Sequence, residues 1–330
     1  MSDEKGNGFV ELEQGGGGAK SAELIGLIRG IISDRGKWKN QMDDSATLKI
    51  GDSHLVMTTD AYIVDPLFFP GGDIGKIAVC GTINDLAMMG AVPQGLSLSM
   101  VIEEGFPKED LMRISRSIQQ ASHEAGVPIV TGDTKVTPKG KIDKIEITTA
   151  GVGLAKRVIA NGGAKAGDAI IASGDLGEHT VALLSSRFNY KSKLKSDSKT
   201  LHREMQAIGR YVHAAKDPTR GGLAANIIEI AEKSKVRIVL EEENLPFKKE
   251  TVAIAGLLGI DMLSFASEGR FIAAVAVRDA AKGLQILKKF NPEAKVIGRA
   301  EKGKGVFLET NLKSSRPIEM PRGKLVPRIC

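Results

Sequence analysis

The chain has 330 residues, of which 42% are hydrophobic and 26% charged, so it suits two globular domains and is too apolar for a disordered protein. Its net charge is +6. Only 4% of its residues are aromatic, and this low content disfavours stacking platforms for single-stranded nucleic acid. Two cysteines cannot build a disulfide framework, and polar residues interrupt the most apolar region, 77–102. We therefore expect a cytoplasmic protein that binds neither nucleic acid nor a membrane.

The first 35 residues are expected to form a glycine-rich flap and a helix. The run of glycines ends in Ala19 and Lys20, whereas a P-loop needs glycine directly before the lysine and another where Gln14 stands, so a P-loop is excluded. A flap of bare amides could still close over phosphates, with a plain flexible linker as the alternative. The predicted phosphate-binding residues are Gly16, Gly17, Gly18 and Lys20. Apolar residues at helical spacing then predict an amphipathic helix ending near Ser33.

Residues 36–160 alternate between strand and helix patterns. Strands are expected at 54–59, 95–102, 127–131 and 145–153, and helices at 73–90 and 107–126. Asp73 can cap the start of the first helix, while Gly90 and Gly126 mark the ends of the two helices. This half is expected to be the N-terminal domain.

A small-residue break at 161–167 predicts the domain boundary. Beyond it we expect strands at 168–173, 236–240, 271–277, 295–299 and 305–310, a short helix after Glu178, helices at 200–214, 220–234, 248–258 and 279–290, and a basic loop at 189–199. Both halves therefore mix helices with strands as α/β or α+β layers. The expected divisions are 1–35, 36–160, a C-terminal domain at 161–312 and a flexible tail at 313–330.

Several acidic residues in the first half occupy positions where burying a carboxylate costs free energy. They precede or end strands or interrupt an apolar helix, at Asp43, Asp44, Asp60, Asp85 and Asp133. Such carboxylates cost free energy unless something pairs with them, and together they could converge on Mg²⁺, whose shell phosphate oxygens complete. The predicted metal ligands are Asp43, Asp60, Asp85 and Asp133. Singly, each has an ordinary alternative as a cap, a turn residue or a buried hydrogen-bond acceptor.

The second half offers two further candidates. Arg220 precedes a predicted helix and could fork onto phosphate, although Thr219 could simply cap that helix. Glu268 precedes a predicted strand and could act as a base, or could pair with Arg270 on a surface turn. Cys80 lies in an apolar helix and is predicted to be a core residue.

The chain ends in a cysteine, Cys330, after an approach stiffened by prolines and given a hinge at Gly323. Ten extended residues span roughly 33 Å, enough to move a thiol between two sites. Cys330 is therefore interpreted either as a tethered nucleophile that carries a covalent group or as a free thiol on a disordered tail.

Five stretches together resemble the hydrogenase maturation factor HypE family, the carbamoyl dehydratases, which is related to aminoimidazole ribonucleotide synthetase, selenophosphate synthetase and thiamine phosphate kinase. They are 64–76, 80–85, 130–136, 217–222 and 327–330. The resemblance implies a two-domain synthetase-like fold whose N-terminal strands form a barrel at a homodimer interface. It also implies Mg-ATP bound by the flap and the acidic motifs, which include all five aspartates. Many relatives place lysine directly after glycine, so Ala19 makes the role of Lys20 less secure.

The resemblance also implies a reaction for the tail. HypF, a carbamoyltransferase, would load Cys330, ATP would activate the carbamoyl oxygen, and dehydration would leave a thiocyanate for the iron on the HypC–HypD scaffold. By residue type and motif position, Glu268 is the predicted base, Lys135 the cation or relay, and Arg220 the phosphate ligand. The rival readings are a small-molecule kinase resembling thiamine phosphate kinase, which has no use for a terminal cysteine, and a non-catalytic carrier.

Overall fold

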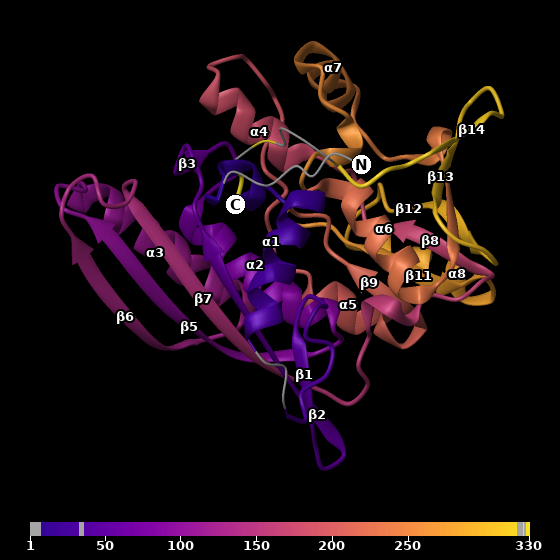
Figure 1. Cartoon of the computed structure of the whole chain (residues 1–330), viewed down its shortest axis with the longest axis horizontal. Coiled ribbons are helices and arrows are strands. Elements are labelled where there is room, and N and C mark those ends of the chain that lie inside the picture. The colour runs from indigo at the N-terminus through magenta and orange to yellow at the C-terminus, as the bar shows by residue number, and fades with distance from the viewer. Residues whose placement is uncertain (1–7, 33–35, 322–325, 327) are drawn as a thin grey trace.

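Two mixed sheets with helices packed on them make up the fold (Figure 1). The structure is a computed structural model that describes residues 8–32, 36–321, 326 and 328–330. Gly323, Pro327 and Ser33, which figured in the sequence predictions, lie outside these residues. None of the described helices combines the length and the apolar character that crossing a membrane requires. The predicted combination of helices and strands in both halves is confirmed.

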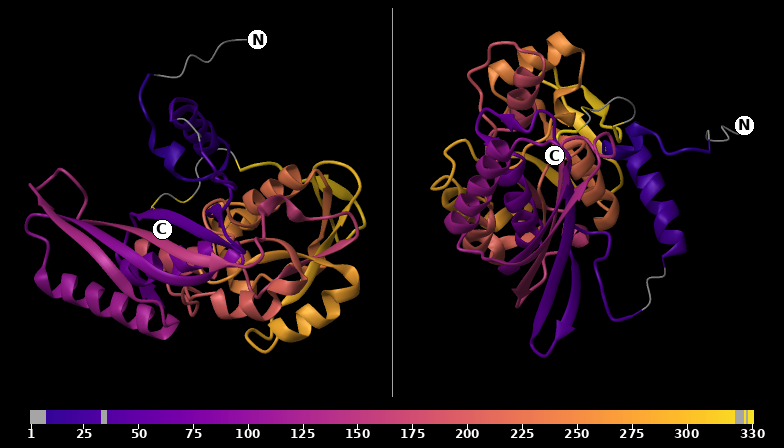
Figure 2. Two further views of the ribbon diagram at one scale, coloured as in Figure 1. Left: turned by 90° about the horizontal axis from the view of Figure 1, so that it is seen from below. Right: turned by 90° about the vertical axis from the view of Figure 1, so that its left-hand side faces the viewer.

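The first sheet has five strands in the order β1 (Ala46–Ile50), β2 (Ser53–Tyr62), β7 (Ile145–Ala155), β5 (Val92–Glu103) and β6 (Ile129–Thr137). Only the β5–β6 pair is parallel. Helices α2 (Ile74–Met88) and α3 (Lys108–Ala125) cover one face, as the edge-on view in Figure 2 makes clear for α3. The other face exposes apolar side chains, including the cross-strand pair Met57 and Val152. Because β1 and β6 remain open edges within one chain, the interface barrel requires a second copy and stays a prediction.

The second sheet has seven strands in the order β14 (Ser315–Pro317), β13 (Val306–Glu309), β10 (Arg237–Glu241), β12 (Lys295–Glu301), β8 (Asp168–Ala172), β11 (Ile272–Ala276) and β9 (Val212–Lys216). Helix α6 (Gly222–Ser234) packs on one face, and α5 (His202–Ile208) and α8 (Val277–Leu287) on the other. Adjacent residues of a strand point to opposite faces, so Ile170 packs with α6 and Ile171 with α5 and α8. This double coverage explains the continuous apolar runs in the second half.

The remaining elements lie around the two sheets. They are α1 (Gly18–Ile31), α4 (Glu178–Arg187), α7 (Lys249–Leu258), the small hairpin of β3 (Phe68–Phe69) and β4 (Gly72–Asp73), and single turns of 3₁₀ helix at Leu12–Gly15, Asn161–Gly163, Gly209–Tyr211, Glu242–Asn244 and Met262–Ser264. The predicted helix boundaries at two positions are confirmed. The Asp73 side chain accepts a hydrogen bond from the Lys76 amide at 3.0 Å, and Gly126 ends α3 in the left-handed region with φ 70°.

Several sequence predictions were wrong. The helix expected over 200–214 ends at Ile208, and residues 212–216 form edge strand β9, where an apolar Val-His-Ala-Ala run packs into the sheet. The strand expected at 127–131 continues to Thr137, so Asp133 lies within β6 rather than after it. Residues 315–317 of the expected flexible tail form β14, which pairs with β13 and is followed by buried Ile318. Strands β1, β3 and β4 were not predicted, and Thr219 does not cap α6, which begins at Gly222 with Gly221 as its cap residue.

A buried amide joins the two halves of the molecule. Asn84, fully buried in α2, donates to the carbonyl oxygens of Lys199 at 3.1 Å and Glu268 at 3.2 Å. Its side-chain oxygen accepts a hydrogen bond from the Leu201 amide at 2.8 Å. The polar interruption in the apolar helix is therefore a structural link that fixes the loop carrying Glu268.

Replacing Asn84 with alanine should weaken this link strongly. Three buried backbone groups would lose their partner, and since each unsatisfied group costs about 1–3 kcal/mol, we expect the free energy of unfolding to fall by about 3 kcal/mol. Chemical denaturation of N84A and wild type measures the difference. Asn311→Ala, at an exposed position, is the control, and equal stabilities of N84A and wild type would contradict the assignment.

Candidate active site

A small cavity lies where the two halves meet the end of the chain. Its volume is about 40 Å³, and it is lined by Asp60, Ala61, Tyr62, Gly81, Asp85, Asp217, Thr219, Arg220, Glu268 and Cys330. Strand β2 and helix α2 supply the residues of the first half, and the loop before α6 and the loop before β11 supply those of the second. The structure thus brings the terminal cysteine together with four of the predicted site residues: Asp60, Asp85, Arg220 and Glu268.

Two carboxylates of the first half are fixed by hydroxyl groups. Asp60 accepts hydrogen bonds from Tyr62 Oη and Thr82 Oγ1, both at 3.2 Å, and Asp85 accepts one from Thr58 Oγ1 at 2.8 Å. Burial raises the pKa of both carboxyl groups. For Asp85, the negative charges of Asp60, Asp217 and Asp44 raise the pKa further, well above its ordinary value. The cavity therefore concentrates negative charge that a cation would stabilise.

Asp44, Asp85 and Asp217 form a group that could hold such a cation. One carboxylate oxygen from each lies within 4.8 Å of the others. Asp44 also forms an ion pair with the Lys216 ammonium, but its buried Oδ2 has no hydrogen-bond partner in the described part of the chain. Three carboxylates whose oxygens converge in this way, one of them carrying an unpartnered buried oxygen, fit a hard divalent cation such as Mg²⁺. Sequence reasoning did not assign Asp217 as a ligand, because the edge strand that ends just before it was predicted as helix.

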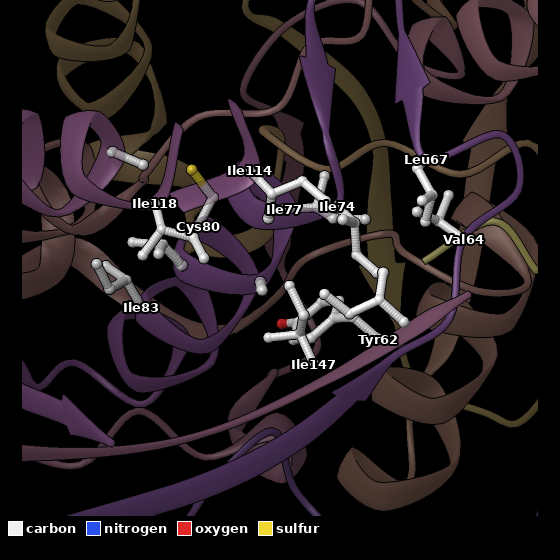
Figure 3. Close-up of a cluster of buried hydrophobic side chains, with 14 of the residues drawn as sticks. Tyr62, Val64, Leu67, Ile74, Ile77, Cys80, Ile83, Ile114, Ile118 and Ile147 are labelled. Atoms are coloured by element: carbon white, nitrogen blue, oxygen red, sulfur yellow. The ribbon is translucent and has the colours of Figure 1, made fainter. Parts of the chain in front are cut away.

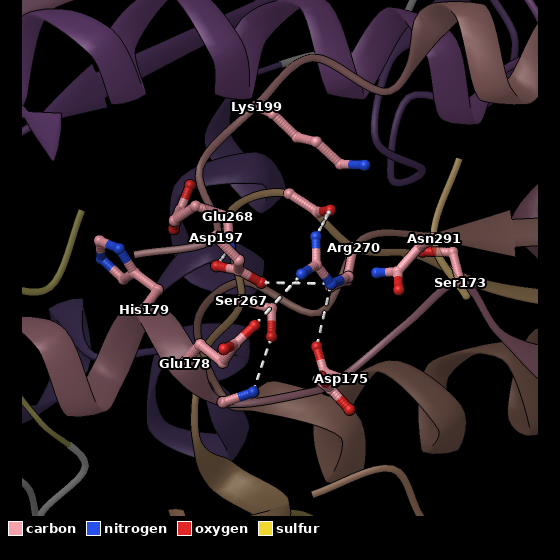
Figure 4. Close-up of polar contacts among 12 residues, drawn as sticks. Ser173, Asp175, Glu178, His179, Asp197, Lys199, Ser267, Glu268, Arg270 and Asn291 are labelled. Atoms are coloured by element: carbon pink, nitrogen blue, oxygen red, sulfur yellow. Dashed lines mark hydrogen bonds and ion pairs between the residues drawn. The ribbon is translucent and has the colours of Figure 1, made fainter. Parts of the chain in front are cut away.

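Glu268 is buried and only 2% exposed, and its Oε1 has no partner among the residues that the structure describes. Burial, followed by the charges of Asp217 and Asp197, raises the pKa of this carboxyl group well above its ordinary value. The alternative pairing with Arg270 on a surface turn is wrong. Arg270 is itself buried and bonds instead to Glu178 at 3.2 Å and to the Asp175 carbonyl at 3.0 Å (Figure 4).

The glycine-rich segment approaches the cavity through Arg220. The guanidinium donates to the Gly15 carbonyl at 3.3 Å, and a Cβ atom on Gly17, whose φ is 87°, would come within 2.9 Å of Arg220 Cβ. Only glycine suits a position with this backbone and this close contact. Gly16 and Gly18 flank it, and Lys20 forms an ion pair with Glu13. The flap therefore lies against the residue predicted to bind phosphate.

The Cys330 thiol is held in its neutral form. Burial raises its pKa above the ordinary value and the nearby Glu268 raises it further, while Arg220 opposes the shift. Cys80, the other cysteine, is 2% exposed and packs among isoleucines, including Ile83 and Ile118 (Figure 3). The prediction that Cys80 is a core residue is confirmed.

Besides Asp44 and the flap residues, three predicted site residues do not line the cavity: Asp43, Asp133 and Lys135. Asp43 lies in a structural junction, with Lys233 at 2.9 Å from Oδ1 and the Asn161 amide at 3.1 Å from Oδ2. Asp133 and Lys135 pair at 2.7 Å on edge strand β6, with exposed side-chain fractions of 60% and 68%. The ion pair lowers the pKa of Asp133.

Comparisons with known proteins place the chain in a family. Residues 42–155 match the family model of the AIR synthase related protein N-terminal domain, and residues 165–311 match that of its C-terminal domain. The carbamoyl dehydratase HypE of Rhizobium leguminosarum bv. viciae is 43% identical over 336 residues, covering 98% of this chain and 96% of that protein.

Solved structures of HypE proteins are also similar to this chain. HypE in a HypE–HypF complex is similar with 38% identity and a TM-score of 0.85, over 90% of this chain and 99% of that one. The hydrogenase maturation protein HypE in complex with ATP shows 35% identity and a TM-score of 0.82, over 98% of this chain and all of that one, 100%. A thiamine monophosphate kinase from Aquifex aeolicus, at 20% identity and a TM-score of 0.68 over 88% and 97% of the chains, shares the fold alone.

The crowded carboxylates should make stability depend on pH. Burial and the charge of Asp44 raise the pKa of Asp217 from 3.8 to about 7, so between these values the unfolded chain loses a proton that the folded chain retains. Stability should therefore fall as pH rises through that window and level off above it. Without divalent cations, Asp217→Asn should reduce the fall in melting temperature from pH 5 to pH 7.5.

The exposed variant Asp52→Asn serves as the control and should reproduce the wild-type slope. Excess Mg²⁺ should restore the melting temperature of the wild type at pH 7.5 more than that of D217N, because the cation replaces the retained proton. Identical pH slopes for wild type and D217N would contradict the shifted pKa.

Proposed function

We propose, from the fact that the chain belongs to the HypE family of carbamoyl dehydratases, that it dehydrates a carbamoyl group carried on its own Cys330. One observation supports this above all others. The last residue of the chain lies in the same cavity as Glu268, Arg220 and buried aspartates. A terminal thiol placed among groups suited to phosphate and proton chemistry is an attachment point for a reacting group rather than a stray cysteine.

The chemistry requires that oxygen leave a thiocarbamate, S–CO–NH₂. The amide oxygen is a poor leaving group, and ATP supplies the phosphoryl group that turns it into phosphate. The C–O bond then breaks, two N–H protons leave the nitrogen, and the C≡N bond of a thiocyanate forms on the same sulfur. The products are ADP, phosphate and S-cyano-Cys330, so no oxidant or reductant is needed.

Glu268 is the proposed base for the nitrogen. A carboxylate whose pKa is raised by burial binds a proton more tightly once it is ionised, which suits it to accept one from an N–H group. Its free Oε1 leaves one acceptor available for that proton. Arg220, whose positive charge opposes the rise in the pKa of the Cys330 thiol, is the proposed ligand for the phosphate group as it gains negative charge.

Asp44, Asp85 and Asp217 are the proposed Mg²⁺ ligands, with Asp60 beside them, because an oxygen of each converges and Asp44 also has a buried oxygen without a partner. The cation would neutralise phosphate charge during the transfer. Gly16, Gly17, Gly18 and Lys20 are proposed to cover the phosphates, since this segment already contacts Arg220. A solved relative was crystallised with ATP, which supports nucleotide binding.

A homodimer is proposed through the uncovered face of the first sheet. This face exposes apolar side chains that align across the strands, among them Met57, Val92, Val152 and Leu154. Lys135 and Asp133 lie on the exposed edge of this sheet, and we propose that they reach the nucleotide of a second subunit across the interface. Asp43 is then a residue that supports the site rather than a ligand.

The proposed partners follow from the reaction. HypF, which forms a complex with a solved relative, is the proposed source of the carbamoyl group. The HypC–HypD complex, which carries iron, is the proposed acceptor of cyanide for the hydrogenase, and the reactions would occur in the cytoplasm. The kinase alternative has only a shared fold in its favour and gives Cys330 no role.

Intact-mass measurement tests the covalent sequence. Incubation with the carbamoyltransferase and carbamoyl phosphate should add about 43 Da at Cys330, and ATP should reduce the gain to about 25 Da, as the atoms of CONH and CN replacing hydrogen require. Cys330→Ser should show neither change, while a Cys80→Ala control should show both. An unmodified Cys330 in the wild type would contradict the proposal.

Glu268→Gln should separate loading from dehydration. Removing the base should slow dehydration of the carbamoylated chain by roughly 10²–10⁴-fold while the mass gain of loading remains. Single-turnover mass spectrometry after addition of ATP measures the rate, with exposed Glu243→Gln as the matched control. Wild-type dehydration by E268Q would remove Glu268 from this role.

A further inference from the structure

The end of the tail is hydrogen-bonded to residues 63–65 of its own chain. The Asp65 amide donates to the Arg328 carbonyl at 3.1 Å, and the Ile63 amide donates to an oxygen of the Cys330 α-carboxylate at 3.4 Å. These two bonds follow an antiparallel register, in which each step along 63–65 is a step back along 328–330. The backbone of the tail is therefore held in register, not only its terminal side chain.

Helix α4 supplies two further donors to the same backbone. His179 Nε2 lies 2.8 Å from the Ile329 carbonyl oxygen, and Arg187 Nη2 lies 3.0 Å from that of Arg328. Arg187 also donates to the Asp65 carbonyl through Nε at 2.9 Å, so one guanidinium joins both strands. The carbonyl oxygens of Arg328 and Ile329 and one oxygen of the Cys330 α-carboxylate thus each accept a hydrogen bond from the body.

The protonation of His179 suits this contact. Burial lowers its pKa, so the ring is neutral and has one N–H. Nδ1 lies 2.8 Å from Ser196 Oγ, which accepts from the Ser198 amide at 3.2 Å and so has its own proton free to donate. This arrangement places the ring proton on Nε2, where it points to the tail.

The Ile329 side chain fixes the register between these bonds. It is 5% exposed and belongs to the same apolar cluster as Val64, Phe69 and Leu183. The Phe69 ring packs edge-on against His179 with their centroids 5.2 Å apart. Shifting the tail by one residue would remove Ile329 from this cluster and place a different side chain at the cavity.

The helix that binds the tail is also bonded to the loop that carries Glu268. Ser267 Oγ accepts from the Gly177 amide at 2.8 Å, and Thr180 Oγ1 accepts from the Ala266 amide at 2.7 Å. Arg270 reaches Glu178 from the same loop, and Figure 4 shows His179 pointing away from that ion pair. His179, which binds the tail, and Glu268, the proposed base, therefore lie on two segments that are hydrogen-bonded to each other.

We propose that His179 and Arg187 are positioning residues that bind the tail backbone and fix the register of Cys330 opposite Glu268. The assignment rests on the proposed function for its catalytic meaning, whereas the docking itself does not depend on it. Neither residue lines the cavity around Cys330, so both act through the tail and not on the reacting atoms.

The first test measures docking in the full, unmodified chain. The rate at which a maleimide alkylates Cys330, located by peptide mass, reports how often the tail leaves the cavity. His179→Met removes the donor at similar size and should accelerate alkylation roughly five- to tenfold, as expected for the loss of one hydrogen bond. His179→Gln retains an N–H near Nε2 and should restore most of the protection. His213→Met, which alters a histidine bonded to Asp168, is the matched control and should alkylate at the wild-type rate.

The second test measures dehydration of the carbamoylated chain. H179M should lower the single-turnover rate by a similar factor and leave the KM for ATP unchanged, and Arg187→Met should do the same if H179M fails to fold. Faster alkylation with no dehydration in any protein, wild type included, would support the docking role and overturn the proposed function instead. Wild-type alkylation and dehydration rates in folded H179M and R187M would overturn the inference.

Discussion

The burial of several carboxylates in one small space is the constraint on which the site depends. Asp44, Asp60, Asp85, Asp217 and Glu268 all have pKa values raised chiefly by burial, and neighbouring negative charges add to most of these shifts. A fold keeps such a group only when cations offset it. Lys216 and Arg220 supply two positive charges from the second domain. These two cations and the acidic residues of the first domain therefore stabilise each other across the junction.

The same constraint explains why the domains meet where they do. Asn84 lies one residue before Asp85 on α2 and bonds to the Glu268 carbonyl, so one turn of helix carries both a candidate ligand and the contact that fixes the base. Gly81, one turn earlier, has no room for a side chain, because a Cβ atom there would lie 2.2 Å from Tyr62 Oη. Packing, polar bonding and the chemical site are thus combined in a single buried helix.

The sequence predicted the chemistry better than the geometry. Four residues of one cavity were identified from the sequence. Asp60 and Asp85 stood out because a charged residue interrupts an apolar pattern, and Arg220 and Glu268 were identified from their motifs. Asp217 was not assigned as a ligand, because periodicity cannot distinguish a short edge strand such as β9 from the continuation of a helix. His179 was passed over for a related reason: its partners, Ser196 and the tail, are distant in sequence, and no local pattern predicts a bond from a helix to the chain terminus. The length of β6 was underestimated since its polar, exposed residues lack the alternation of a half-buried strand.

The cavity selects between chemical states of the tail. Because burial and Glu268 raise the pKa of the Cys330 thiol, the docked site disfavours the thiolate, which is the form that attacks a carbamoyl donor. A thiolate is stabilised by water, so loading is favoured while the tail is away from the carboxylates. Once the sulfur carries a carbamoyl group it has no proton to lose, and the electrostatic penalty against a charged sulfur disappears. The backbone bonds from His179, Arg187 and residues 63–65 do not involve the sulfur atom, so a carbamoyl group on Cys330 leaves these contacts available. The acidic pocket would therefore slow loading of a docked thiol, whereas the docking contacts remain available to the loaded tail.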